Sequence, residues 1–294
     1  MASSDNTDAV VTPLSLADLP EALALSASAH WNQNTSDWRT MLELGTGFGI
    51  RATDEQGQQR LAASTIVLPY GSEFAWVSMV LVLPAFQRRG FASQLLRHAL
   101  ADLSARGMAG VLDATPAGHA VYLQEGFRDT WGFARYRRER AAAMPDRPAG
   151  PPTRALRDTD WPAVEAIDTP SFGASRLPLL RSLATRWPQA ARVVEQGGRI
   201  RGFMFGRDGR EAHQLGPLLA ESTEVAQSLI ADGMREAPGP VYLDLLDDRK
   251  PELLPWLQQQ GFAFQRPFTR MVVGASRAPG DKRHIVLVAG PELG

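Results

Sequence analysis

The segment with the clearest chemical character joins an apolar stretch, Val77–Leu83, to a helix that begins near Arg89. The chain between them reads Pro84-Ala85-Phe86-Gln87-Arg88-Arg89-Gly90-Phe91-Ala92. The first N–H groups of a helix lack intrahelical acceptors and carry the positive end of the helix dipole, so they can bind a phosphate. Gly90 would let the backbone approach closely, and the arginines add positive charge. The spacing predicts a phosphate-binding turn, with an ordinary strand-to-helix turn as the alternative.

This pattern resembles the acetyl-CoA signature of the GNAT N-acetyltransferase superfamily, whose loop reads Gln/Arg-x-x-Gly-x-Gly/Ala. The resemblance implies acetyl-CoA as cosubstrate, with its pantetheine arm in a gap between the strand at 77–83 and a strand at 111–114. It assigns pantetheine contacts to Val80, Leu81 and Val82. The residues that it places around the pyrophosphate are Gln87, Arg88, Arg89, Gly90, Phe91, Ala92 and Ser93.

A second family element follows the loop. The string Ala120-Val121-Tyr122-Leu123-Gln124-Glu125-Gly126-Phe127 resembles the GNAT pattern Ala-x-x-Tyr-x-x-x-Gly-Phe, with the alanine nearer the tyrosine. The family tyrosine commonly protonates the departing CoA thiolate, so the resemblance implies that Tyr122 is the general acid. A reference pKa of about 10 for tyrosine, against about 8.5 for a thiol, makes that transfer roughly matched. The alternative is a ring packed on the helix with its hydroxyl in water.

The general base is not fixed by the sequence. Many GNAT enzymes carry a glutamate on the strand before the loop, but residues 74–79 contain no carboxylate. Asp113, at the end of a strand beside the expected gap, and His119 are candidates to accept a proton from the attacking amine. Asp113 also fits an Asx turn, and His119 also fits a solvated position near a helix start.

The acceptor pocket is expected beside the first two helices and the strand before the loop. The candidate substrate-binding residues are His30, Trp31, Trp76 and Ser78. His213 and Asp244 could reach the same pocket from the second half of the chain.

A glycine-rich segment suggests a different chemistry. Gly45-Thr46-Gly47-Phe48-Gly49 resembles the loop of S-adenosylmethionine methyltransferases, which should follow an apolar strand and precede a helix. Here residues 34–44 have the pattern of a capped helix and residues 49–53 that of a strand. The glycines are therefore predicted to end a helix.

The 294 residues exceed what one core usually serves, so two domains are expected. The proline-rich segment 140–152 is predicted to be a linker between an acetyl-CoA-binding domain (1–139) and a second domain (153–294). The elements expected in the first half are strands at 10–14, 48–53, 61–68, 74–83, 111–114 and 127–137, and helices at 18–29, 34–44, 89–106 and 118–125.

The second half repeats the first at a nearly constant offset of about 135 residues, which indicates a duplicated fold. Trp256–Phe262 matches Tyr122–Phe127, for example. In the second copy, Glu221 and Glu224 replace Gln87 and Gly90. Two carboxylates would repel a pyrophosphate, so this copy is predicted to be degenerate, to bind no CoA and to shape the acceptor pocket. A tail strand at 284–288 is expected to pair back.

The fold class is therefore predicted as α+β: two tandem GNAT-type domains, each a mixed, mostly antiparallel sheet flanked by helices. A net charge of −1 argues against nucleic-acid or membrane partners. Zero cysteines and five scattered histidines argue against a metal site. The first residues do not have the pattern of a signal peptide, and a bacterial cytoplasmic location is expected.

Together these features predict an N-acetyltransferase that moves the acetyl group of acetyl-CoA to a primary amine of a small molecule by direct attack. A non-catalytic acyl-CoA sensor and, less favoured, an S-adenosylmethionine methyltransferase are the alternatives. The sequence indicates neither the amine nor the oligomeric state.

Overall fold

The computed structural model describes residues 9–139 and 150–294. In the first half, the order of strands and helices is as predicted, and their bounds agree to within a few residues. The elements are β1 (Val11–Leu14), α1 (Leu19–Ser28), α2 (Thr35–Leu44), β2 (Thr46–Thr53), β3 (Gln59–Tyr70), β4 (Phe74–Val82), α3 (Phe91–Ala105), β5 (Ala109–Ala114), α4 (Pro116–Gln124) and β6 (Arg128–Arg138). Most of the expected linker, residues 140–149, lies outside the described residues.

The second half repeats this plan, which agrees with the predicted duplication. Its elements are β7 (Thr153–Ala155), α5 (Trp161–Phe172), α6 (Leu177–Arg186), β8 (Arg192–Gln196), β9 (Arg199–Arg207), β10 (His213–Ala220), α7 (Thr223–Glu236), β11 (Val241–Leu246), α8 (Lys250–Gln259), β12 (Ala263–Val273) and β13 (Ile285–Leu287). The last strand lies where a pairing tail was expected.

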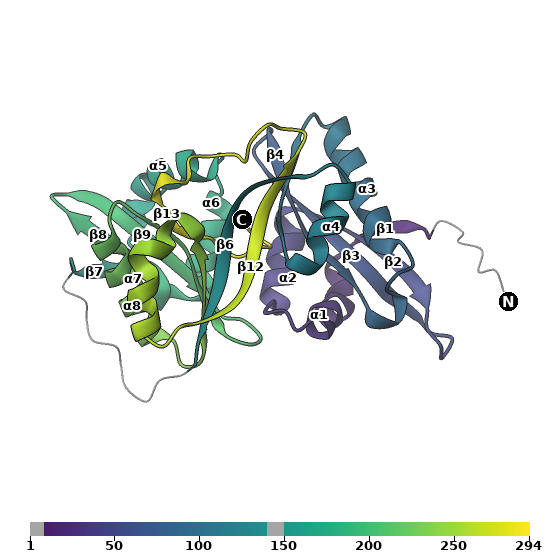
Figure 1. Cartoon of the computed structure of the whole chain (residues 1–294), viewed down its shortest axis with the longest axis horizontal. Helices are drawn as coiled ribbons and strands as arrows, with labels where there is room; N and C mark the ends of the chain where they lie inside the picture. Colours follow the sequence, from purple (N-terminus) through teal and green to yellow (C-terminus); the bar gives the residue numbers. More distant parts are fainter. Residues whose placement is uncertain (1–8, 140–149) are drawn as a thin grey trace.

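The two halves share one sheet. The described residues form 13 strands in the order β1-β2-β3-β4-β5-β12-β6-β11-β13-β10-β9-β8-β7. The strand β12 of the second half lies between β5 and β6 of the first half and pairs antiparallel with both. Figure 1 shows β6 and β12 side by side through the middle of the molecule. The sequence pattern predicted the duplication but not this exchange, because strand partners are long-range contacts that a local pattern does not record.

A gap opens between β4 and β5, as the family resemblance implied. The two strands pair in parallel over only three residues each, Phe74–Trp76 with Ala109–Val111, and then separate. The equivalent strands of the second half, β10 and β11, also pair over a short parallel stretch. There β13 lies between them and pairs antiparallel with both. The gap therefore remains open in the first half and is filled in the second.

Helices cover both faces of the sheet because successive strand residues point to opposite sides. On one face, Leu96 and Ala99 of α3 pack with Val77. On the other face, Trp38 of α2 shares a core with Trp76 and with residues of α5 and α6. The helices α2, α5 and α6, which come from both halves, thus share one core. No helix among residues 9–139 and 150–294 is long and apolar enough to cross a membrane.

Candidate active site

A groove of about 800 Å³ runs from the start of α3 into the gap between β4 and β5. Nearly all the residues predicted to hold the cosubstrate line this groove: Val80, Leu81, Val82, Gln87, Arg88, Gly90, Phe91, Ala92 and Ser93. Arg89 lies outside it. The Arg89 guanidinium sits 5.0 Å from the centre of the Phe86 ring and donates to the carbonyl of Ala85 at 3.2 Å. The arginine pair thus divides into one groove residue and one that braces the turn.

The start of α3 is open toward this groove. Gly90 is the N-cap residue with φ +83°, and no side chain among the described residues caps the helix. A Cβ at Gly90 would meet nothing within 4 Å, so the glycine is required by its left-handed backbone and not by crowding. Arg88 also has a positive φ, of 62°. This turn aims unpaired N–H groups and the positive end of the dipole into the groove, which suits an anion.

The matching helix of the second half is closed. The Ser222 side chain accepts from the Val225 N–H at 3.4 Å and so caps α7. Glu224 adds a carboxylate in the first turn, and Glu221 is held by Arg201 at 2.8 Å. A capped, acidic helix start beside a gap filled by β13 suits a phosphate less well than the open start of α3.

A bulge in β4 faces the groove. The register pairs Ile66 with Ser78 and Ser64 with Leu81, which leaves Met79 and Val80 opposite Thr65. Met79 adopts φ +52°, which is strained for a residue with a side chain. Two buried hydroxyls stabilise this backbone conformation.

The Ser64 Oγ donates to the Met79 carbonyl at 2.8 Å, and the Thr65 Oγ1 donates to the Ser78 carbonyl at 3.2 Å. The sequence reasoning missed both residues. Adjacent hydroxyls inside an otherwise apolar strand were the available signal.

Tyr122 lies on α4 and lines both the groove and a smaller cavity beyond it. Thr115 caps this helix by accepting from the Gly118 N–H at 3.3 Å. A Cβ at Gly118 would lie 2.9 Å from the Tyr122 ring, so the glycine leaves room for it. Burial raises the pKa of Tyr122 to about 12. The expectation of a value near 10 is therefore wrong, and the hydroxyl stays protonated at neutral pH.

The two candidate bases lie in different surroundings. Asp113 lines the groove, but Arg270 of β12 holds both its oxygens, at 2.9 Å each, in a buried ion pair. Burial raises the pKa of Asp113, and the Arg270 charge opposes this rise. His119 does not line the groove and contacts Asp129 through Nε2 at 2.8 Å. Neither is presented to the groove as a free base.

The four candidate substrate-binding residues do not all lie together. Trp31 and Ser78 line a smaller cavity beyond Tyr122. Trp76 is fully buried, and its indole N–H donates to the Pro291 carbonyl at 3.0 Å, which makes it a core residue behind that cavity. His30 is exposed at the end of α1 and lines neither space. The structure thus brings together two of the four residues.

The smaller cavity, called the inner cavity below, has a volume of about 30 Å³. It shares with the groove the lining residues Trp31, Val80, Asp113, Thr115, Tyr122 and Arg266. The second half contributes Arg266, Phe268, Pro291 and Glu292. The sequence reasoning missed these residues, because β12 and the tail reach the site only through the exchange of strands. His213, in contrast, lies against Trp187, and Asp244 is paired with Arg135 in the core.

Comparisons with known proteins give the family. Two family models, each described as an acetyltransferase (GNAT) domain, match residues 50–129 and 164–286. The chain is 25% identical over 236 residues to the holothin acyltransferase of Pseudoalteromonas sp. (strain SANK 73390). The aligned residues are 79% of this chain and 77% of that protein.

Solved structures share the whole fold. The crystal structure of a protein from Pyrococcus horikoshii, described as an acetyltransferase, matches with a TM-score of 0.74 and 18% identity. The match covers 97% of this chain and 96% of that protein. A tandem GNAT protein from the clavulanic acid biosynthesis pathway matches with a TM-score of 0.63 and 17% identity, over 90% and 98%. The two GNAT matches lie one in each half of a duplicated fold, and the chain therefore belongs to the GNAT acetyltransferase family, with two GNAT domains in tandem.

Proposed function

We propose that this protein transfers the acetyl group of acetyl-CoA to the primary amine of a small molecule. The observation that carries the proposal is the continuous path from the open start of α3, through the gap between β4 and β5, to Tyr122 and the inner cavity. An anion-binding end, a channel and a small polar end are what a long acyl donor and a small acceptor need.

The residues along this path have separate tasks. The N–H groups at the start of α3 and Arg88 would hold the pyrophosphate. The exposed main chain of β4 near the bulge would bind the pantetheine and polarise the thioester carbonyl, since fixed N–H donors stabilise the oxyanion that forms when the amine attacks. Tyr122 would donate a hydrogen bond to the sulfur as the C–S bond breaks.

The second half would take no acyl donor of its own. Its helix α7 is capped by Ser222, and β13 occupies its gap. Its contribution is Arg266 and Glu292 at the inner cavity. The proposal is therefore one acyl-CoA site per chain.

The direct test measures thiol release from acetyl-CoA with a panel of amines: polyamines, amino acids, aromatic amines, aminoglycosides and a peptide with a free N-terminus. Calorimetry with acetyl-CoA alone gives affinity and stoichiometry. We expect one site per chain and turnover with at least one small amine. Binding without turnover of any amine would favour an acyl-CoA sensor, and a lack of binding would refute the assignment of the groove.

A further inference from the structure

The inner cavity is lined by three buried polar atoms that have no hydrogen-bond partner within the described residues. They are the Gln33 Oε1, the Arg266 Nε and the Glu292 Oε2. Buried polar atoms are nearly always paired, so three orphans around one small space indicate a missing polar group. Two of the three are acceptors, and one of these belongs to a carboxylate.

The size of the cavity limits what can meet these atoms. Its 30 Å³ is room for about two or three water-sized groups, since a water needs roughly 10–15 Å³ of such space. A primary amine head fits this space and carries the hydrogens that the Glu292 Oε2 and the Gln33 Oε1 lack. A phosphate would be too large, and an anion would face the charge of Glu292. Of the two arginines that also line the cavity, Arg135 is paired with Asp244, and Arg266 lies over the Phe268 ring.

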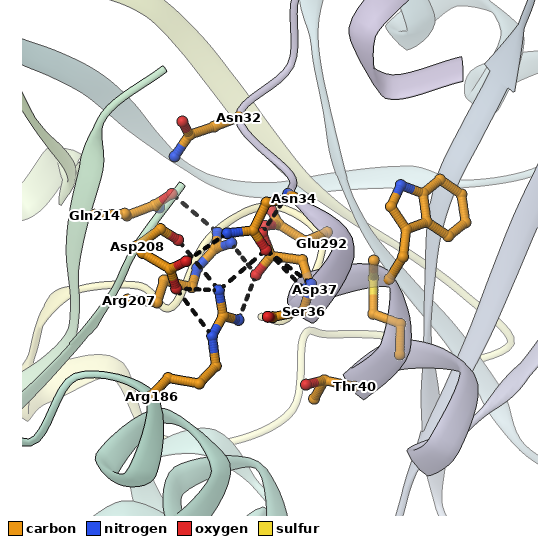
Figure 2. A network of polar contacts seen from close by, with 12 residues as sticks. Asn32, Asn34, Ser36, Asp37, Thr40, Arg186, Arg207, Asp208, Gln214 and Glu292 are labelled. Carbon is orange, nitrogen blue, oxygen red and sulfur yellow. Dashed lines mark hydrogen bonds and ion pairs between the residues drawn. The ribbon is translucent and has the colours of Figure 1, made fainter. Parts of the chain in front are cut away.

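The Glu292 side chain is held rigidly by a network of buried charges (Figure 2). Its Oε1 accepts from the Arg207 Nη2. Arg207 also donates to Asp37 at 2.6 Å and to the side-chain oxygen of Gln214 at 2.9 Å. Asp37 in turn pairs with Arg186 at 2.7 Å. One carboxylate oxygen is thus fixed to the network, and the other is left for the cavity.

The tail that carries Glu292 is anchored from both halves of the chain. The Tyr70 hydroxyl donates to the Leu293 carbonyl at 2.7 Å, and the Trp76 indole donates to the Pro291 carbonyl at 3.0 Å. Arg176 donates to the Gly294 carbonyl at 2.6 Å. Because these donors are buried core side chains, the carboxylate has little freedom to leave the cavity.

We infer that Glu292, from the tail of the second half, receives the acceptor amine and takes a proton from its nitrogen when the nitrogen attacks the thioester. The inference rests on the proposed function and supplies the base that the first half lacks. The two earlier candidates are occupied, since Asp113 is paired with Arg270 and His119 contacts Asp129. Gln33 would orient the amine through a second hydrogen bond.

The amine nitrogen forms a bond to the carbonyl carbon, and one N–H proton passes to the Glu292 Oε2. The C–S bond breaks and its electron pair goes to the sulfur, which accepts a hydrogen bond from the Tyr122 hydroxyl and ends as a thiol after taking a proton from water. Glu292 then returns its proton to solvent, so the carboxylate is restored.

The first arm of the test compares Glu292→Gln with the wild type, using the best amine of the panel. Glutamine keeps the shape, and its amide oxygen can still accept from Arg207. We expect kcat to fall at least 10²-fold, the range for a lost general base, with the KM for acetyl-CoA within twofold. Asp208→Asn is the matched control: it belongs to the same network through Arg186 but lies outside the cavity, and it should keep its kcat.

The second arm needs no turnover. Calorimetry measures n-propylammonium binding to the wild-type complex with CoA, to Glu292→Gln and to Gln33→Leu, a second variant should the first not fold. We expect the dissociation constant to rise at least tenfold in each variant. Turnover in the wild type with equal kcat in Glu292→Gln overturns the inference and leaves the function standing. Ammonium binding through Glu292 without turnover of any amine overturns the function and leaves the amine site. Equal or absent binding in all three proteins overturns the inference.

Discussion

Replacing Tyr122 with phenylalanine keeps the ring against Phe127 and removes only the hydroxyl at the junction of the groove and the inner cavity. A pKa of about 12 changes what that hydroxyl can do. Full proton transfer to a thiolate, whose conjugate acid has a reference pKa of about 8.5, would be uphill by about 3.5 units, or about 5 kcal/mol. A hydrogen bond to the forming thiolate involves no such cost.

The expected magnitude follows from that hydrogen bond. A bond to a charged group is worth about 1.5–3 kcal/mol, and each 1.4 kcal/mol is about tenfold in rate. We therefore expect Tyr122→Phe to lower kcat by about 10- to 10²-fold, with the KM for acetyl-CoA little changed. Since the hydroxyl does not titrate below about pH 10, the pH profile of the variant should keep the wild-type shape.

The assay is steady-state kinetics from pH 6 to 9, with rapid-quench measurements to establish that acetyl transfer limits the rate. An unchanged kcat in a folded variant whose chemistry is rate-limiting would remove Tyr122 from the mechanism. The loss of an alkaline limb in the variant would refute the argument from burial, because it would mean that the hydroxyl ionises in the working range.

Three further outcomes are expected. Calorimetry should give at least a tenfold weaker acetyl-CoA affinity for Gly90→Glu, about 1.4 kcal/mol, and a smaller change for Gly90→Ala, whose cost is backbone strain alone. Asp113→Asn should lose about 3–5 kcal/mol in denaturant unfolding because it leaves Arg270 unpaired, and a folded variant with kcat lowered 10²-fold would instead make Asp113 catalytic. Burial raises the pKa of Tyr70 and of Tyr122 above the unfolded value, so the free energy of unfolding should fall as the pH rises above about 10. This fall should be less steep in Tyr70→Phe, and an equal slope of unfolding free energy against pH in the variant and the wild type would contradict the argument.

The groove could be predicted because its determinants are neighbours in the chain. The turn that opens α3 depends on residues 87–92, and a left-handed glycine before an apolar helix is a local pattern. Tyr122 was found for the same reason. The acidic start of α7 could be predicted too, since Glu224 is placed there by its own helix.

The acceptor side could not be predicted because its partners are far apart. Asp113 stands 157 positions from Arg270, and nothing near Asp113 indicates an ion pair. Glu292 gave no signal as a lone carboxylate in a short tail. Residues judged by type alone, such as His30 and Trp76, line neither the groove nor the inner cavity: the structure has one at the surface and the other in the core. Long-range pairing, not local propensity, decides these positions.

The insertion of β12 between β5 and β6 has a consequence for how the protein is made. When a ribosome has released residues 9–139, β5 and β6 have no strand to join them, since their shared neighbour Ala263–Val273 is not yet synthesised. These two sheet edges stay unpaired while more than a hundred further codons are translated. Unpaired edges readily pair with other chains. We therefore expect the nascent first half to need protection by chaperones, and the groove between β4 and β5 to be completed only at the end of translation.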